Sequence, residues 1–474
     1  MERNRSQRWL MAAVLTFFVI VKILLAHQIT FFSDSISCFS RPASFYFDTH
    51  LQCLFFSGNY DNGDPRIFQY LLACLWTLFG KSMWVTHLFF LPAMLGAVWQ
   101  AMRLASQTIG YQPRPFWQLA IGMALLLADP TFLTQLLLPG TDVWLLFFAL
   151  WSFNGIAERN SKSMSVAWLL LCMVSRRGMI VAAVLMIVFA VQLWLHRKQE
   201  SINIFRKLWP AIPGVCVVLT YLLLRYTHQG WIFSSPGNEW ADSGQWAEPS
   251  AMLKNLAVYG WRNLDFGRVF IWIFILLTVW RKGWHSLFCK DNQLLLLAYI
   301  LLQIAFMCVT LPLQNSFGCR YFVMQYLLLT AIALNMLFHN YSLRQVRIAG
   351  PALIIMLLSG NLWVYPERIA QNWDSTLGHL SFYPARNECL EYLHQHHIPL
   401  GQTASGFSIY GPQCLIFANN DHHSIQQQIK TDTRYYIYSN ICNESDSMQM
   451  FLNQLPVVRT FNKGEIFIKL IRLR

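Results

Sequence analysis

Charged residues are scarce in this chain of 474 residues. Asp, Glu, Lys and Arg together make up only 12% of it, whereas about 25% is usual in a soluble domain. Hydrophobic residues make up 55% and aromatic residues 15%. This composition excludes an ordinary soluble domain and indicates a polytopic, mainly α-helical membrane protein.

Several functional motifs are also missing. The chain contains no Walker loop, GxSxG elbow or HExxH motif. The loops that we place in the cytoplasm are too short for a nucleotide-binding fold, which disfavours an enzyme that uses a soluble nucleotide-sugar. No internal repeat is visible, and this argues against a transporter built from inverted repeats.

The eleven cysteines form no CxxC pair, and their odd number supports neither a disulfide scaffold nor a zinc ribbon. Two of Cys389, Cys414 and Cys442 could still form a disulfide. The histidines at 394–397 and 421–423 could supply metal ligands, but solvated surface histidines are commoner. We therefore predict no cofactor and leave dependence on a divalent metal open.

Long apolar runs are abundant instead. About 17 to 25 apolar residues cross a bilayer as a helix, and about eleven runs approach that length. The first is interpreted as a retained helix, because its basic start "MERNRSQRW" is followed by no convincing cleavage site. The predicted spans are 9–31, 83–102, 116–137, 142–157, 163–175, 178–195, 208–226, 268–281, 293–312, 320–338 and 348–364.

Basic loops orient this predicted bundle. They fall on alternate ends of the spans, and short loops rich in Lys and Arg stay in the cytoplasm. We therefore expect the N-terminus inside and, with an odd number of spans, the tail from about Tyr365 outside. This topology and contact with anionic lipid account for the net charge of +13. Membrane lipids, and no nucleic acid, are the expected partners.

Three predicted outer segments, 32–82, 227–267 and the tail, are too long to be simple connectors. In the first, the apolar run Ile67 to Phe79 would be about 20 Å long as a helix, too short to cross comfortably, so it should lie at the interface. In the tail, "RNECLEYLHQHH" has helical spacing, whereas "RYYIYSN" and "GEIFIKLIRL" are typical of strands. We predict a transmembrane module over 1–364 and a small extracytoplasmic α/β domain over 365–474.

Four segments occur in the order and spacing of one family's signatures. They are "GNYDNGDPRIFQYLLACLWTLFGKSMWVTHLFFLPAMLGAVW", "LLPGTDVWLLFFALW", "MVSRRGMI" and "CRYFVMQYLLL". Together they resemble the GT-C superfamily of membrane glycosyltransferases, in the branch containing protein O-mannosyltransferases and aminoarabinose transferases. "SRPASFYFD" and "QNWDSTLGHL" are similar to bacterial enzymes of the Bacteroidota type. The resemblance covers roughly residues 9–340.

This resemblance implies a GT-C fold in the inner membrane of a bacterium and an inverting transfer of one sugar. The donor would be a polyprenyl-phosphate-linked sugar, and the acceptor a glycan, a lipid or a protein on the outer face. The alternatives are a glycan polymerase or ligase, or a lipid or solute transporter without chemistry. A transporter should carry several charges inside its spans. Here Lys22 is the clearest one, and we expect it to snorkel toward the surface.

The family's general base is an aspartate just after the first span, and such a base must reach an acceptor hydroxyl. Asp34 lies about 30 residues before the "DP" element, close to the family spacing. Asp48 lies nearer to that element and is the alternative, and either could instead be a cap or turn acid. Asp61 is most simply a turn residue, with a role in the site as the second interpretation.

A lipid-phosphate leaving group needs positive charge at headgroup depth. Arg176 and Arg177 follow a short predicted span and should lie slightly inside the outer leaflet, where charges tend to be functional. An arginine fork matches phosphate oxygens, so this pair is the first candidate for a phosphate clamp. The alternative is a pair of interface anchors. Arg320, with Tyr321 beside it, is the second candidate.

Five further residues are candidates for the donor or acceptor environment. Asp64 stands where the family has a basic residue. Asp142 follows "PGT" and could simply cap a helix. Trp373, Asp374 and His379 lie in "WDSTLGH" and could line an acceptor groove or belong to an aromatic belt.

Overall fold

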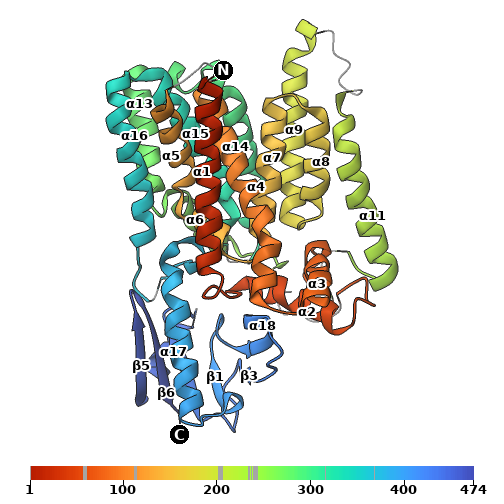
Figure 1. Ribbon diagram of the computed structural model, residues 1–474, viewed down its shortest axis with the longest axis vertical. Coiled ribbons are helices and arrows are strands. Elements are labelled where there is room, and N and C mark those ends of the chain that lie inside the picture. The colour runs from red at the N-terminus through yellow and green to blue at the C-terminus, as the bar shows by residue number, and fades with distance from the viewer. Residues whose placement is uncertain are drawn as a thin grey trace.

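The computed structural model describes residues 2–56, 61–110, 115–200, 207–232, 235, 238, 244–314, 317–367, 369–442 and 444–473. A bundle of helices makes up most of the molecule, and a smaller region of strands and helices lies against one end of it (Figure 1). The N-terminus is at the opposite end of the bundle, and the C-terminus belongs to the smaller region (Figure 1).

Seven helical segments among the described residues are long and apolar enough to cross a membrane. The helices that form them are α1 (Glu2–Leu25), α4 (Met83–Ile109), α9 (Arg176–Glu200), α11 (Ile212–Gln229), α14 (Lys290–Thr310), α15 (Val323–Asn340) and α16 (Leu343–Leu358). Other apolar helices are α5 (Phe116–Leu127), α6 (Pro130–Leu137), α7 (Thr141–Ala157), α8 (Ser161–Cys172), α12 (Pro249–Leu264) and α13 (Arg268–Lys282). The bundle reaches nine spans if α5 with α6 and α12 with α13 each count as one. The predicted count of about eleven is not confirmed, although a helix occupies each predicted position.

Both bent pairs have a local cause. α5 and α6 meet at 75°, because Asp129 caps α6 by accepting the N–H of Phe132 at 3.0 Å, and Pro130 lacks the N–H of a continuous helix. α12 and α13 meet at 81° around Gly267, whose φ is +84°. The predicted span 116–137 is therefore a broken helix.

The segment 32–82, which is predicted to be outside the membrane and is called the first outer loop below, carries α2 (Arg41–Asp48) and α3 (Ile67–Phe79). Both helices lie at the end of the bundle far from the N-terminus (Figure 1). α3 has the bounds that the apolar run predicted. One of its faces is buried through Leu72 and Trp76, while Leu78 and Phe79 are exposed. The helix thus packs one face on the protein, and its place at a membrane interface stays a prediction.

The C-terminal region contains the predicted helix and strands. α17 (Phe382–Gln395) packs on a four-stranded sheet of order β1-β4-β6-β5, in which β1 and β4 are parallel and the other pairs antiparallel. The strands are β1 (Thr403–Ser405), β4 (Tyr435–Ser439), β5 (Val457–Lys463) and β6 (Ile466–Arg472), with a separate pair β2 (Gly411–Pro412) and β3 (Ser424–Ile425) and the helices α18 (Gln413–Phe417) and α19 (Asp446–Leu452). All eleven cysteines lie in the described residues and are free thiols. The disulfide considered for this region is therefore not formed.

Short turns join these elements. They are η1 (Ile36–Ser40), η2 (Trp209–Ala211), η4 (Trp284–Ser286), η5 (Cys319–Phe322), η6 (Ser359–Leu362), η7 (Trp373–Ser375), η8 (Leu377–Ser381) and η9 (Leu400–Gln402).

The core of the C-terminal region continues into the bundle, because Ile29 and Phe32 after α1 and Leu138 after α6 are buried in it. The two parts therefore share one apolar seam.

Lys22 is buried in α1, with 2% of its surface exposed. Its Nζ donates a hydrogen bond of 2.6 Å to the carbonyl oxygen of Leu137, the last residue of α6. The prediction that Lys22 snorkels to the surface is wrong, because the carbonyl end of α6 supplies a partner inside the bundle.

Candidate active site

Most of the acidic and basic residues selected from the sequence meet at one cavity. It lies where the first outer loop, the starts of α7 and α9 and the C-terminal region come together. The empty space at this site, including open solvent at its mouth, is about 630 Å³. The lining residues are Phe32, Asp34, Ser35, Cys38, Asn62, Asp64, Gln135, Leu138, Pro139, Gly140, Thr141, Asp142, Arg177, Arg320, Tyr321 and Asp374.

Arg320 is the centre of this cavity's charge cluster. It belongs to η5, and only 11% of its side chain is exposed. Its Nη2 forms an ion pair with Oδ2 of Asp34, and its Nε lies 3.3 Å from Oδ2 of Asp374. Its Nη1 lies 3.8 Å from Oδ2 of Asp142. One guanidinium therefore holds three carboxylates that come from distant parts of the chain.

Arg177 supplies the second guanidinium. Its Nη2 lies 2.7 Å from Oδ1 of Asp142, which belongs to the first turn of α7. Both cations make cation–π contacts with the ring of Tyr321. The Arg177 guanidinium lies 4.4 Å from the ring centroid, and the Arg320 guanidinium lies 5.4 Å from it. Asp142 and Tyr321 together keep two positive charges at one wall of the cavity.

Asp64 joins the first outer loop to the start of α9. Its Oδ1 accepts the backbone N–H of Arg176 at 2.9 Å and lies 3.5 Å from Nε of the same residue. Burial opposes the ionisation of Asp64, but the charges of Arg176 and Arg66 and the backbone hydrogen bond outweigh it, so the pKa of Asp64 is lowered. An ionised carboxylate here also stabilises the positive N-terminal end of α9.

Asp374 enters the cavity from the C-terminal region. Its carbonyl accepts a hydrogen bond of 2.7 Å from Nε2 of Gln135, and the neighbouring Ser375 carbonyl accepts one of 3.1 Å from Oγ1 of Thr131, both on α6. Burial raises the pKa of Asp374, and the nearby Asp34 and Asp142 add to this effect, although Arg320 opposes it. Asp374 is therefore an acid that protonates more readily than an ordinary carboxylate.

The cavity holds more negative than positive charge. Among its lining residues, four carboxylates (34, 64, 142 and 374) face the two guanidiniums of Arg177 and Arg320. Both guanidiniums are engaged by carboxylates.

The structure separates several of the other candidates from the cavity. Asp48, at the end of α2, is exposed and does not line it. Asp61 is fully buried behind the cavity wall, where it pairs with Arg225. Trp373 and His379 lie in the core of the C-terminal region: the Trp373 Nε1 donates to the Asn440 carbonyl at 3.0 Å, and His379 packs on Phe32. Neither residue lines the cavity, and the acceptor-groove and aromatic-belt interpretations of both stay predictions.

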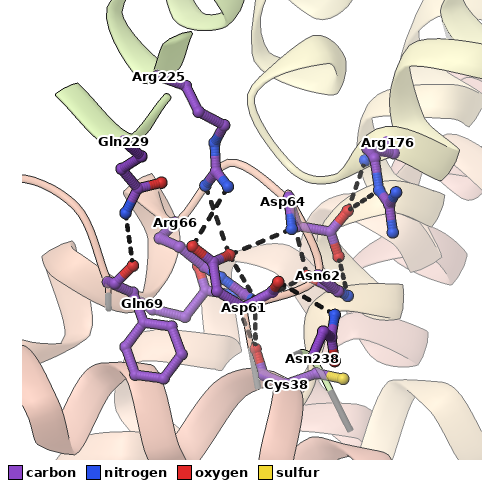
Figure 2. Close-up of polar contacts among 12 residues, drawn as sticks. Cys38, Asp61, Asn62, Asp64, Arg66, Gln69, Arg176, Arg225, Gln229 and Asn238 are labelled. Carbon is purple, nitrogen blue, oxygen red and sulfur yellow. Dashed lines mark hydrogen bonds and ion pairs between the residues drawn. The ribbon is translucent and has the colours of Figure 1, made fainter. Parts of the chain in front are cut away.

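Some residues that line the cavity or lie behind its wall were not found from the sequence. Arg225, which lies within the predicted span 208–226, forms a buried ion pair with Asp61 (Figure 2). Arg66 donates to the Cys38 carbonyl at 2.8 Å and to Oδ1 of Asn62 at 2.7 Å. A charge inside an apolar run was the available signal for Arg225, whereas nothing local distinguishes Asn62 or Gln135.

These features define a helical membrane protein whose charged cavity lies between its bundle and a C-terminal α/β region. No protein-family model matches the chain, and no curated protein matches its sequence. Two solved structures match it, both of ArnT from Cupriavidus metallidurans. The structure bound to undecaprenyl phosphate has a TM-score of 0.54 and 12% identity, and covers 97% of this chain and 98% of that chain. The apo structure has a TM-score of 0.55 at the same identity and coverage. The chain therefore has the fold of ArnT, which confirms the predicted GT-C fold class.

Proposed function

We propose that this chain is an inverting membrane glycosyltransferase. It would move a monosaccharide from a polyprenyl-phosphate carrier to a glycan, lipid or protein acceptor on the extracytoplasmic face. The observation that carries the proposal is a cavity in which Arg177 and Arg320 face Asp34, in a chain that has the fold of ArnT. ArnT itself has been crystallised with undecaprenyl phosphate, so that fold accommodates a lipid phosphate of this class.

The two guanidiniums suit the phosphate end of the donor. An arginine fork offers paired N–H donors that match phosphate oxygens, and the ring of Tyr321 supports both cations. Phosphate would compete with Asp34 for Arg320. Donor binding would therefore place positive charge on the leaving group and release the carboxylate of Asp34.

Asp34 suits the role of general base. Its side chain is 34% exposed, so an acceptor hydroxyl can reach it from the cavity mouth. The carboxylate takes the hydroxyl proton while the acceptor oxygen attacks the anomeric carbon. The bond between that carbon and the phosphate oxygen breaks, and its electron pair leaves with the carrier phosphate, which Arg177 and Arg320 neutralise. Attack opposite the leaving group inverts the anomeric centre.

The proposed face follows from the charge of the loops. The positions of the basic loops favour a cytoplasmic N-terminus. The C-terminal region, which contributes Asp374 to the cavity, lies at the other end of the bundle (Figure 1). An extracytoplasmic cavity would open where lipid-linked sugars meet acceptors of the cell envelope.

The test is turnover by the full-length protein in lipid nanodiscs. Undecaprenyl-phosphate-linked radiolabelled sugars are supplied with a panel of glycan, lipid and peptide acceptors, and released undecaprenyl phosphate is measured. We expect wild type and Asp48→Asn to turn over and Asp34→Asn to lose at least about 100-fold in kcat, as expected for removal of a general base. Release that collapses in Asp48→Asn instead reassigns the base. Binding of undecaprenyl phosphate without turnover on any sugar would overturn the proposed chemistry.

A further inference from the structure

A buried ion pair lies behind the cavity wall. Arg225, near the end of α11, places Nη1 3.2 Å from Oδ2 of Asp61 and Nη2 3.5 Å from Oδ1 (Figure 2). Only 1% of each side chain is exposed. The Arg225 guanidinium also lies 4.4 Å from the ring centroid of Trp231 and 5.1 Å from that of Tyr221. Neither member of the pair lines the cavity.

Stability alone does not account well for such a pair. Desolvation of two charges can cancel their attraction, so an apolar pair of similar size is often as stable. What the pair does provide is a directional contact between α11 and the first outer loop. Two further hydrogen bonds join α11 to the same loop. Tyr221 OH donates to the Gly63 carbonyl at 3.2 Å, and Gln229 Nε2 donates to the Phe56 carbonyl at 3.0 Å.

The turn that Asp61 opens leads directly to the cavity. Besides pairing with Arg225, the Asp61 carboxylate accepts a hydrogen bond of 3.1 Å from the backbone N–H of Gly63, whose φ is +80°. Oδ1 of Asn62 accepts the backbone N–H of Asp64 at 3.2 Å. Asp64 in turn holds the N–H of Arg176 at the start of α9 (Figure 2). The next residue along α9 is Arg177, one of the two guanidiniums of the cavity.

We propose that Arg225 and Asp61 are positioning residues for this site. Through the turn at 61–64, they fix Asp64 against the start of α9 and so set where Arg177 meets the donor phosphate. The role of Arg177 in this inference rests on the proposed function. The mechanical link from Arg225 to the start of α9 rests only on the contacts given above.

The test separates positioning from stability. Full-length protein in nanodiscs is compared as wild type, Arg225→Met, Arg225→Lys and the double variant Asp61→Asn with Arg225→Met, which leaves no unpaired carboxylate at position 61 and keeps an oxygen for the Gly63 N–H. Arg66, whose Nη2 lies 3.9 Å from Oδ1 of Asp61, keeps its hydrogen bonds to the Cys38 carbonyl and to Asn62 in this variant. Arg268→Met is the matched control, because Arg268 forms a similarly buried ion pair with Asp129, in which Nε lies 2.8 Å from Oδ2. That pair joins α13 to the start of α6 and does not involve the turn at 61–64. Three quantities are measured: melting temperature, deuterium exchange over 61–66 and 176–180, and affinity for undecaprenyl phosphate.

We expect Arg225→Met and the double variant to accelerate exchange in both segments and to weaken binding of undecaprenyl phosphate about tenfold, with Arg225→Lys between them and wild type. The melting temperature should recover in the double variant while exchange and affinity do not. Arg268→Met should lower the melting temperature without changing exchange at 61–66. In turnover assays, the loss should appear mainly in KM, because the phosphate contact is made in the ground state as well.

The outcomes are distinct for the two proposals. Exchange over 61–66 and 176–180 that is unchanged in Arg225→Met, or restored together with stability in the double variant, overturns the positioning role. Wild type that neither binds undecaprenyl phosphate nor turns over a carrier-linked sugar overturns the proposed function instead. The exchange measurement still decides the link from Arg225 to α9 in that case.

Discussion

Nε of Arg320 lies 3.3 Å from Oδ2 of Asp374. Arg320 belongs to η5 at the edge of the bundle, whereas Asp374 belongs to η7 in the C-terminal region. The same guanidinium holds Asp34 from the first outer loop. The C-terminal region is therefore part of the cavity wall, and the cavity depends on how that region packs on α6.

Asp34→Asn should separate catalysis from carrier binding. In wild type, Asp34 and the donor phosphate would compete for Arg320. Removing the negative charge of Asp34 ends this competition, so undecaprenyl phosphate should bind several-fold more tightly, by about 1 kcal/mol. Turnover should be lost in the same variant. Native mass spectrometry in nanodiscs gives the affinity, and Asp48→Asn, with its exposed carboxylate outside the cavity, is the control. Weaker binding in Asp34→Asn would mean that Asp34 orients Arg320 for phosphate and does not compete with it.

Arg177→Lys should weaken carrier binding although the charge is kept. Lysine has no planar fork and stacks less well on Tyr321, so we expect a loss of about tenfold in affinity, about 1.4 kcal/mol. The matched control is Arg347→Lys. The Arg347 guanidinium also lies over an aromatic ring, 4.8 Å from the centroid of Trp117, but Arg347 is exposed and lines no part of the cavity. An equal loss in both variants would assign the effect to the membrane surface.

Asp374→Asn should lower kcat/KM by roughly tenfold, less than Asp34→Asn, because the variant removes a partner that orients Arg320 and leaves the proposed base intact. It should also change the pH profile. The pKa of Asp374 is raised above its ordinary value, so in wild type this acid protonates before an ordinary carboxylate as the pH falls. The acidic limb of the kcat/KM profile should therefore move to lower pH in Asp374→Asn. An unchanged limb would show that protonation of Asp374 does not limit the reaction.

His379 should make the stability of the protein depend on pH. Burial lowers its pKa from about 6.5 to about 4. The unfolded chain then binds more protons than the folded chain between those values, so stability falls as the pH drops from about 6.5 toward 4. At about 1.4 kcal/mol per pH unit, the loss reaches roughly 3 kcal/mol.

His379→Gln should flatten that part of the stability profile, because glutamine does not titrate. Thermal unfolding in nanodiscs at pH 7.5, 6 and 5 would check this. His394→Gln, an exposed position on α17, should keep the wild-type profile. Parallel profiles for wild type and His379→Gln would contradict the assignment.

The sequence by itself determined the class of the protein and its local elements. Scarce charge and long apolar runs indicated a membrane bundle, and the short apolar run Ile67 to Phe79 predicted α3 with its observed bounds. Alternation predicted β6, and helical spacing predicted α17. Hydrophobic periodicity predicts these features, and it depends only on residues that are close together in the sequence. The order of four family-like segments added the GT-C fold.

Only the tertiary structure decided which charges meet. Asp34 and Asp48 are both acids after the first span, yet only Asp34 lines the cavity, because α2 carries Asp48 to an exposed end. The predicted span 116–137 is broken at Asp129, whose cap and following proline end the continuous helix. The pair of Asp61 with Arg225 and the contact of Asp374 with Arg320 join residues far apart in the chain. Distances of this kind are set by how helices, loops and the C-terminal region pack, and no local pattern records them.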